Sequence, residues 1–320
     1  MAAPSSPSAN NMIATRKAFG EALTLAGEKH KNLVVLDADL TTSVMAQFFA
    51  EKFPDRHFNL GIAEQDLVDT AAGLAMAGKL PIAASFSMFL TGLGWQQIRN
   101  AICYPNLNVK LVGSHAGIQV GEDGATHQAL EDLAIMRVIP NIKVFCPADA
   151  IEMKKMLPVI LDDYGPCYIR IGRQPVPIVY DDTYEFHIGK GSILHEGDDI
   201  GIIAIGSLVG SALAAAERFK QEGISVRVVN MSSLKPIDIG LIEETSRKVH
   251  MMVTAEDHQT SGGLAGAVAE VLTQTRPRTF HRIGMHDRFG ESGKSADLYR
   301  KYRFDADGVY EQLKEWWDVE

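Results

Sequence analysis

The sequence is poor in cysteine and has no excess of basic residues. Only Cys103, Cys146 and Cys167 occur among 320 residues, an odd and widely spaced set without a Cys-x-x-Cys pair. This pattern argues against a disulfide framework and a structural zinc site, and it favours small buried thiols in a reducing cytoplasm. With 31 basic and 40 acidic residues the net charge is −9, which argues against a broad nucleic-acid-binding surface. We therefore expect a cytoplasmic protein without a nucleic-acid partner.

Long apolar runs and the common nucleotide-binding loops are also absent. No stretch approaches the roughly 18 apolar residues that a membrane-spanning helix needs, so we expect no membrane association. Residues 1–11 have neither the basic start nor the apolar core of a secretory signal, and their Pro, Ser and Asn content predicts a flexible tail. Neither G-x-x-x-x-G-K-[ST] nor a G-x-G-x-x-G after a strand is present, so these motifs indicate no nucleotide site.

The sequence does contain a regular alternation of short apolar runs and helix-length segments. Alternation of this kind indicates βαβ units and a mainly parallel sheet, so the predicted fold class is α/β. A first series predicts strands at 33–36, 81–86, 109–112, 143–145 and 167–171, and helices at 62–77, 95–103, 129–138 and 150–161. A second predicts strands at 200–205, 225–229, 249–255 and 280–283, and helices at 208–221, 238–248, 262–272 and 306–317.

An irregular segment separates the two series. Residues 175–199 combine prolines, glycines and acidic residues without clean periodicity, so we interpret them as an interdomain linker with room for an irregular strand or two. We expect a first domain at 12–174 and a second at 200–320, each a mainly parallel sheet flanked by helices. This division agrees with a prior of about 150 residues per domain.

The carboxyl ends of the predicted strands are the places to look for a site, because ligands of open α/β sheets bind there. In this sequence these ends are residues 37–43, 86–89, 114–128 and 170–173, all in the first half. The 114–128 segment holds His115 and the run Gly-Glu-Asp-Gly-Ala-Thr-His-Gln at 121–128. Two histidines and two acids at one strand end favour a site for a polar substrate over a solvated turn.

Other candidate residues are ambiguous by themselves. Glu64 lies at a loop-to-helix junction, where the helix dipole alone explains a carboxylate. Phe86 and Phe89 could stack on a ligand, although aromatic residues after a strand more often belong to the core. Residues 256–258 (Glu-Asp-His) end a predicted strand before Gly262 and Gly263 and are a plausible second site on geometry alone. Four arginines suit an anionic ligand and a structural ion pair equally well: Arg16, Arg99, Arg170 and Arg173.

Several runs, taken in order, resemble the transketolase family of thiamine diphosphate enzymes. Gly-Ile-Ala-Glu-Gln at 61–65 and Gly-Glu-Asp-Gly-Ala-Thr-His-Gln at 121–128 make the resemblance specific. The family's pyrimidine-binding domain is matched by 58–65, 71–75, 86–89 and 121–128. Its carboxyl-terminal domain is matched by Gly-Gly-Leu at 262–264 and Asp-Arg-Phe-Gly-Glu-Ser-Gly at 287–293. The resemblance runs from about Ile13 to the end of the chain, and at 256–258 it implies subunit packing instead of a second site.

This resemblance implies roles for residues that bind the cofactor. Glu64 matches the catalytic carboxyl group that hydrogen-bonds N1′ of the thiamine diphosphate aminopyrimidine and so promotes loss of the thiazolium C2 proton. Phe89, with Phe86 nearby, matches the aromatic positions that stack on the aminopyrimidine. Asp39 matches an acid near the thiazolium at the boundary between subunits. The cofactor would supply the carbanion chemistry, and the protein would position it.

The resemblance also implies roles for residues that bind the substrate. His115 and His127 match catalytic residues that contact the substrate's hydroxyl groups and carbonyl oxygen. Asp123 matches a residue that recognises the α-hydroxyl group of the acceptor aldehyde. Three residues match the positions that bind the phosphate of the sugar: Arg16, Ser43 and Arg173. The implied reaction is transfer of a two-carbon ketol unit between sugar phosphates.

One part of the family pattern is missing. Full-length members bind the cofactor diphosphate through Mg²⁺ with a Gly-Asp-Gly stretch and a later asparagine, and this sequence has no Gly-Asp-Gly. The resemblance therefore implies the carboxyl-terminal subunit of a split transketolase. An amino-terminal partner subunit would hold Mg²⁺, two copies of each subunit would assemble, and this chain would supply no metal ligand and show no turnover alone.

Related activities differ from this pattern in identifiable ways. 1-Deoxyxylulose 5-phosphate synthase shares Gly-Ile-Ala-Glu-Gln but differs around 122–123 and has a His where this chain has Gln128. The β subunit of 2-oxo acid dehydrogenases shares the split organisation but lacks the Thr-His pair found at 126–127. A non-catalytic regulatory subunit of the same fold is a third alternative. The retained Glu64, His115, Asp123 and His127 argue against it.

Overall fold

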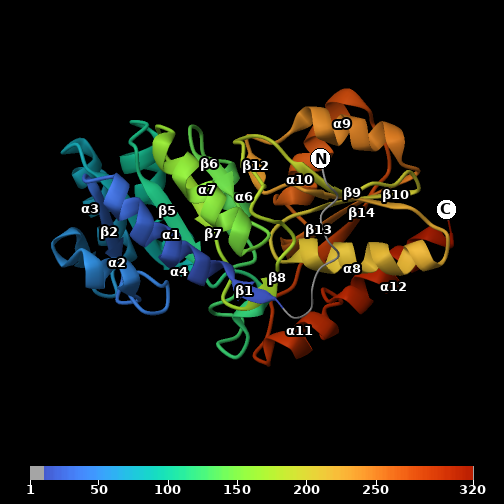
Figure 1. Cartoon of the computed structure of the whole chain (residues 1–320), viewed down its shortest axis with the longest axis horizontal. Coiled ribbons are helices and arrows are strands. Elements are labelled where there is room, and N and C mark those ends of the chain that lie inside the picture. The colour runs from blue at the N-terminus through green and yellow to red at the C-terminus, as the bar shows by residue number, and fades with distance from the viewer. Residues whose placement is uncertain (1–10, 320) are drawn as a thin grey trace.

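The computed structural model describes residues 11–319, which form two α/β lobes (Figure 1). The sheet of the first lobe has seven strands in the order β12-β6-β7-β5-β4-β2-β3, all parallel except β12. These strands are β2 (Leu33–Asp37), β3 (His57–Asn59), β4 (Leu80–Phe86), β5 (Lys110–Ser114), β6 (Lys143–Phe145), β7 (Cys167–Arg170) and β12 (Ser233–Lys235).

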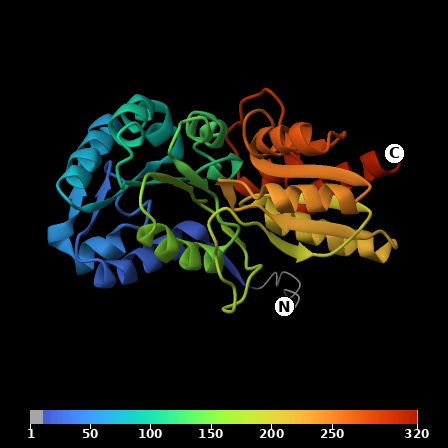
Figure 2. The same cartoon turned by 90° about the horizontal axis from the view of Figure 1, so that it is seen from above.

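Helices lie on both faces of this first sheet (Figure 2). They are α1 (Thr15–Lys29), α2 (Gln47–Lys52), α3 (Glu64–Met76), α4 (Ser87–Leu93), α5 (Trp95–Gln97), α6 (Asp132–Arg137) and α7 (Ala150–Asp162). The α5 helix continues into a π-helical turn at Ile98–Cys103, and short 3₁₀ turns occupy Pro54–Arg56 and Ile118–Val120. Helix α7 begins with a side-chain cap, because Asp149 accepts a hydrogen bond from the Glu152 amide at 2.7 Å.

The sheet of the second lobe has five strands in the order β14-β13-β10-β11-β9, all parallel except β9. These are β9 (Ser192–His195), β10 (Ile200–Ala204), β11 (Val226–Asn230), β13 (Met251–Gln259) and β14 (His281–Met285). The helices are α8 (Leu208–Gln221), α9 (Ile239–Lys248), α10 (Leu264–Thr275), α11 (Ser295–Lys301) and α12 (Ala306–Trp317). The predicted α/β class, with two mainly parallel sheets flanked by helices, is confirmed.

The sequence pattern did not predict helix α1. The first turn of α1 has no acidic residue and no side-chain cap, and the helix as a whole contains two glycines. Local signals for a helix are therefore weak. Both glycines have a packing reason. A Cβ at Gly20 would lie 2.5 Å from the Met45 carbonyl oxygen, and one at Gly27 would lie 2.5 Å from the Phe53 ring. Tertiary contact with the segment around α2 therefore explains why these positions are glycine.

The segment between the two lobes is packed and paired along much of its length. Strand β8 (Pro175–Pro177) pairs antiparallel with β1 (Met12–Ala14), and the Ile178 amide donates to the Asn11 carbonyl oxygen at 3.2 Å. At its other end β9 joins the second sheet. Strand β12, from the second half of the chain, joins the first sheet, so the packing does not follow the expected division at 175–199 strictly. The predicted tail, apart from Asn11, lies outside the described residues.

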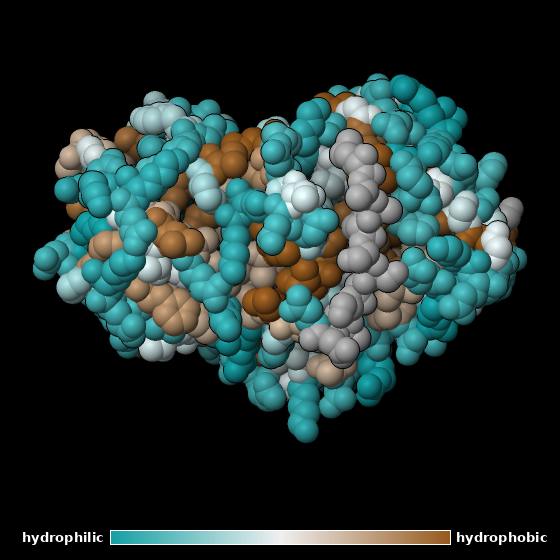
Figure 3. Space-filling model, in the orientation of Figure 1, coloured by the Kyte–Doolittle hydropathy of each residue, from teal (hydrophilic) through white to brown (hydrophobic). Residues whose placement is uncertain are grey.

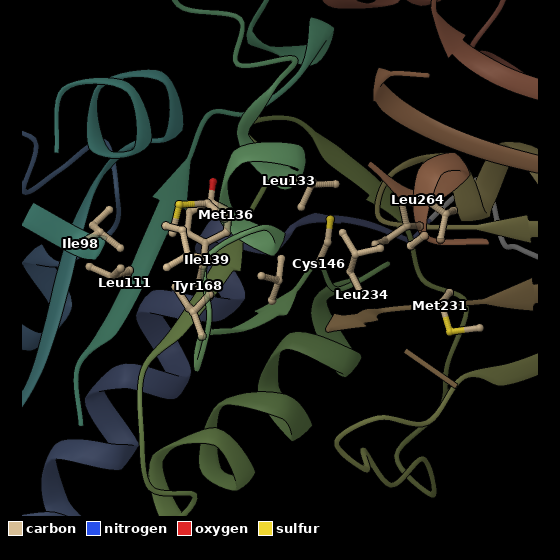
Figure 4. Packing of buried hydrophobic residues seen from close by; sticks show 14 of the residues in the cluster. Ile98, Leu111, Leu133, Met136, Ile139, Cys146, Tyr168, Met231, Leu234 and Leu264 are labelled. Atoms are coloured by element: carbon tan, nitrogen blue, oxygen red, sulfur yellow. The ribbon is translucent and has the colours of Figure 1, made fainter. Parts of the chain in front are cut away.

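A hydrophobic core continues from one lobe into the other. One cluster of buried side chains includes Leu111 and Leu133 from the first lobe together with Met231 and Leu264 from the second. Figure 4 shows Cys146 between the side chains of these two groups. Because the same core stabilises both lobes, we expect them to unfold together.

A buried ion pair lies at the junction of the lobes. The Arg170 guanidinium donates to the Asp132 carboxylate at 2.8 Å and 3.1 Å from Nε, and both side chains are almost fully buried. Arg170 Nη2 donates to the carbonyl oxygens of Ala129 at 3.1 Å and Asp257 at 2.8 Å. The Tyr168 hydroxyl donates to Asp132 at 2.7 Å. Strands β7 and β13 are thus joined through one side chain.

Hydrophilic residues cover most of the face shown in Figure 3, and hydrophobic residues gather towards the middle of the molecule. Within residues 11–319, no helix is both long and apolar enough to cross a membrane. In the same range the three cysteines are free and buried. Burial raises the pKa of the Cys146 thiol to about 12, so this side chain behaves as a small apolar group.

Substitution of Asp132 tests the buried ion pair. In Asp132→Asn the Arg170 charge loses its counter-charge inside the protein, so we expect a loss of about 3–5 kcal/mol in the free energy of unfolding. Asp297→Asn removes an exposed partner of Arg300 and should leave the urea midpoint unchanged. Equal midpoints for both variants would show that the buried pair does not stabilise the junction. Urea unfolding followed by far-UV circular dichroism measures the difference.

Candidate active site

Four aromatic rings meet at the carboxyl end of the first sheet. Phe86 ends β4, Phe89 lies in α4, and His115 and His127 follow β5. The Phe86 and His115 ring centroids are 4.2 Å apart, and Phe89 meets His127 edge-on at 5.1 Å. Phe86 and Phe89 themselves are 6.3 Å apart. The structure thus brings together the predicted stacking pair and both predicted histidines, and both phenylalanines remain partly exposed.

Glu64 adds a buried carboxyl group at the same end of the sheet. It is the first residue of α3, only 4% exposed, and its Oε1 accepts a hydrogen bond from the Ser85 hydroxyl at 2.9 Å. Ser85 directly precedes Phe86 at the carboxyl end of β4, so the carboxyl group lies at the same end of the sheet as the aromatic cluster. A buried carboxyl group with few partners is unusual in a protein, because burial of a charge is costly unless the group is paired or shares a proton.

His115 is held in an uncommon backbone conformation. Its φ is +57°, and the side chain is 4% exposed with Nδ1 2.9 Å from the Ser114 hydroxyl. Burial, followed by the positive charges of Arg16 and Arg173, lowers the pKa of His115 to about 3. The imidazole is therefore neutral at physiological pH, and it can exchange hydrogen bonds with a hydroxyl or carbonyl group without carrying charge.

Two guanidinium groups lie beside the histidines. Arg16 donates from Nε to the Arg173 carbonyl oxygen at 3.1 Å and from Nη1 to the Ser43 carbonyl oxygen at 2.9 Å. Arg173 donates from Nη1 to the Val120 carbonyl oxygen at 2.6 Å and to Asp123 Oδ2 at 3.1 Å. Burial and the nearby Arg173 charge both lower the pKa of Arg16. Two partly exposed guanidinium groups that repel each other are suited to an anion such as a phosphate.

Asp39 lies at the opposite edge of this region, after β2. Its backbone is also left-handed, with φ +60°, and its carboxylate accepts from the Asn59 side chain at 3.2 Å. Asn59 Oδ1 accepts in turn from the Gly61 amide at 2.9 Å. These bonds connect exposed Asp39 to the loop that leads to Glu64. Left-handed non-glycine residues are costly and cluster at functional sites.

The second lobe supports the glycine-rich loop at 121–128. Gly124 has φ +75°, and a Cβ there would lie 2.3 Å from the Ser292 hydroxyl oxygen. Gln128 Nε2 donates to the Glu291 carbonyl oxygen at 3.0 Å. Glu291 and Ser292 belong to the 287–293 run that marks the carboxyl-terminal domain, but sequence reasoning did not predict that they support this loop, because they lie more than 160 positions from it.

The remaining ambiguous residues have structural partners. Arg170 is the buried partner of Asp132 described above, and Arg99 donates to the neighbouring Asn100 side chain on the surface at 2.7 Å. Glu256 accepts from the amides of Leu264 and Ala265, at 2.7 Å and 2.8 Å, at the start of α10. These partners agree with the structural interpretation of these residues.

Comparison with known proteins shows the family. The family described as "Transketolase, pyrimidine binding domain" matches residues 11–178, and "Transketolase, C-terminal domain" matches residues 189–309. The fold and the cluster at the sheet edge thus belong to a thiamine diphosphate-type pyrimidine-binding domain followed by a carboxyl-terminal domain. The chain is a member of the transketolase family.

Several relatives are similar over nearly their whole length. A "Putative transketolase C-terminal section" of Methanocaldococcus jannaschii is 47% identical, with 94% of this chain and 95% of the relative covered. The "6-deoxy-6-sulfo-D-fructose transketolase subunit SqwH" of Clostridium sp. is 37% identical (91% and 90% covered). One of the subunits of an apulose-4-phosphate transketolase from Phocaeicola vulgatus is 35% identical (94% and 96% covered).

A solved structure is also similar over almost the whole chain. It is described as "Split gene transketolase, inactive beta4 tetramer", and it is 46% identical with a TM-score of 0.88. The alignment covers 95% of this chain and 98% of that one.

The residues at the sheet edge fit the aminopyrimidine half of thiamine diphosphate. A flat, apolar heterocycle with polar ring atoms needs an aromatic platform and a buried hydrogen-bonding group, which Phe86, Phe89 and Glu64 provide. Among residues 11–319 no cluster of three or more His, Cys, Asp or Glu side chains is arranged to hold a metal ion.

The low pKa of His115 predicts a specific pH dependence of stability. An unfolded histidine takes up a proton below about pH 6.5, whereas folded His115 does so only near pH 3. Protonation therefore favours the unfolded chain, and stability should fall as the pH drops below 6.5, by at most about 1.4 kcal/mol per pH unit. His115→Asn should lose less stability between pH 8 and pH 5 than the wild type, as urea unfolding would measure.

Exposed His187 offers the matched control for this experiment. His187→Asn should retain the pH dependence of the wild type. A free-energy difference between His115→Asn and wild type that stays constant from pH 8 to pH 5 would contradict the burial-driven pKa shift.

Proposed function

We propose that this chain is the carboxyl-terminal subunit of a two-subunit transketolase that moves a two-carbon ketol unit between sugar phosphates. The observation that carries the proposal is the meeting of a buried carboxyl group, an aromatic pair and two histidines at one sheet edge, next to a pair of guanidinium groups. The carboxyl group and the aromatics suit a cofactor, while the histidines and arginines suit a phosphorylated, hydroxylated substrate.

In this proposal Glu64 and the aromatic pair bind the cofactor. Glu64 shares a proton with N1′ of the aminopyrimidine, and Ser85 orients the carboxyl group through its hydrogen bond to Oε1. Phe86 and Phe89 stack on the ring, and Asp39 contacts the cofactor near the boundary between subunits. Bound thiamine diphosphate supplies the nucleophilic carbon to which the two-carbon unit is transferred.

The remaining residues bind and orient the sugar. Neutral His115, together with His127, exchanges hydrogen bonds with the carbonyl oxygen and hydroxyl groups, and Asp123 accepts from the α-hydroxyl group of the acceptor. Arg16, Ser43 and Arg173 bind the terminal phosphate. Arg173 is paired with Asp123 in the free chain, so binding of the phosphate would release Asp123 for the acceptor.

The proposal includes an amino-terminal partner subunit that binds the diphosphate and Mg²⁺. The names of the relatives, a carboxyl-terminal section and transketolase subunits, and the coverage of nearly their whole length support this division. We further propose a complex with two copies of each subunit, in the cytoplasm. The proposal names no particular sugar, because the names of two relatives refer to different ones, 6-deoxy-6-sulfo-D-fructose and apulose 4-phosphate.

Reconstitution with the amino-terminal subunit tests the proposed function. With thiamine diphosphate and Mg²⁺, the complex should convert xylulose 5-phosphate plus ribose 5-phosphate, and this chain alone should not. Glu64→Gln should lower kcat at least about 100-fold, because the amide cannot share a proton as the carboxyl group does. Glu185→Gln, at an exposed carboxylate, should retain full activity.

Different outcomes separate the alternatives. Turnover by this chain alone would disprove the split site, and an unchanged rate in Glu64→Gln at saturating cofactor would disprove the role of Glu64. Turnover of pyruvate with glyceraldehyde 3-phosphate, and none of the ketoses, would instead identify a 1-deoxyxylulose 5-phosphate synthase-like activity.

Arg173 offers a test of the substrate class. Arg173→Met removes a charged donor from the proposed phosphate site, so KM for a phosphorylated sugar should rise about 10- to 100-fold. KM for the same sugar without phosphate should change little. Steady-state kinetics of the complex compares the two substrates, and an equal rise for both would show that Arg173 does not bind the phosphate.

A further inference from the structure

A carboxylate of the second lobe reaches the turn that follows His115. Asp257, near the end of β13, is 1% exposed, and its Oδ1 accepts a hydrogen bond from the Ile118 amide at 2.8 Å. Its Oδ2 accepts from the Tyr299 hydroxyl at 2.8 Å. A Cβ at Gly117 would lie 2.3 Å from Oδ2, so the carboxylate touches the backbone of the turn where only glycine fits.

This turn has an uncommon backbone that needs support. His115 has φ +57° and Gly117 has φ +76°, and the 3₁₀ turn Ile118–Val120 follows directly. The Gly117 amide also donates to the Ala129 carbonyl oxygen at 2.9 Å. Sparsely populated conformations persist only where surrounding contacts determine them. Helix α11 of the second lobe packs against this turn, and Asp257 supplies a side-chain hydrogen bond to it from the same lobe.

The turn is also connected to the proposed phosphate site. The Val120 carbonyl oxygen accepts from Arg173 Nη1 at 2.6 Å, and Gln119 Oε1 accepts from the Gln174 amide at 3.3 Å. A shift of residues 117–120 would therefore move His115 at one end and the Arg173 guanidinium at the other. Both are groups to which we assign substrate contacts.

We propose that Asp257 is a positioning residue of the transketolase site, which fixes the 117–120 turn and through it orients His115 and Arg173. The second lobe thus has a role in substrate binding beyond packing, although it contributes none of the proposed substrate contacts. This inference rests on the proposed function.

The neighbouring Glu256 provides a matched control. Both carboxylates are fully buried in β13 and accept hydrogen bonds from backbone amides. Glu256, however, accepts its hydrogen bonds from backbone amides at the start of α10, within the second lobe. Asp257→Ala and Glu256→Ala are therefore comparable in burial and in chemical change, because each removes both carboxylate oxygens, and they differ in whether the lost acceptor serves the turn.

Kinetics of the reconstituted complex form the first arm of the test. Asp257→Ala should raise KM for the sugar phosphate about 10-fold and lower kcat less, while the affinity for thiamine diphosphate stays as in the wild type. Tyr299→Phe, which removes one further hydrogen bond to Asp257, should shift KM in the same direction by a smaller factor. Glu256→Ala should leave KM within about twofold of the wild type, even where it lowers thermal stability.

Hydrogen–deuterium exchange of the full chain forms the second arm and requires no activity. Amides of residues 117–121 should exchange at least about 10-fold faster in Asp257→Ala and at the wild-type rate in Glu256→Ala. Unchanged exchange at 117–121, or equal KM increases in the two variants, would overturn the positioning role. An inactive wild-type complex would disprove the proposed function alone, since the exchange arm reports on the turn independently.

Discussion

The buried guanidinium of Arg170 is the interaction on which the junction of the two lobes depends. It neutralises Asp132 and supplies donors to two carbonyl oxygens, one in the loop that follows the active-site segment and one in β13. A buried charge of this kind is stable only when its partners stay in place. The relative position of the two sheets is therefore constrained by a small number of hydrogen bonds as well as by the shared apolar core.

That constraint explains how one lobe can carry the proposed chemistry while the other determines its shape. The residues to which we assign cofactor and substrate contacts all come from the first lobe. Arg16 lies in α1, and the others lie at or after the carboxyl ends of β2, β3, β4, β5 and β7. The loops that carry them have left-handed residues at Asp39, His115 and Gly124. Contacts from Asp257, Glu291 and Ser292 hold the last two loops in place. In this chain the second lobe therefore shapes the proposed site, although it supplies none of the proposed contacts.

Much of the fold was predictable because the signals are local. Buried parallel strands such as β2 and β10 are continuous apolar runs, and α7 and α9 begin at Asp149 and Asp238 with side-chain caps. Helix α1 was missed because its glycines serve contacts with a distant segment, and much of the helix predicted at 95–103 is π-helical. Strand β12 was missed because its partner, β6, lies about 90 residues earlier.

The sequence by itself determined the α/β class, the family and the identity of the candidate site residues, because motifs such as 61–65 and 121–128 place unusual side chains at fixed strand ends. The tertiary structure decided which partners those residues have and which of them are charged. The neutral His115, the repelling pair of Arg16 and Arg173, and the structural role of Arg170 follow from burial and from partners far apart in the chain. Desolvation and long-range hydrogen bonds exist only once the lobes have packed, so no local pattern could encode them.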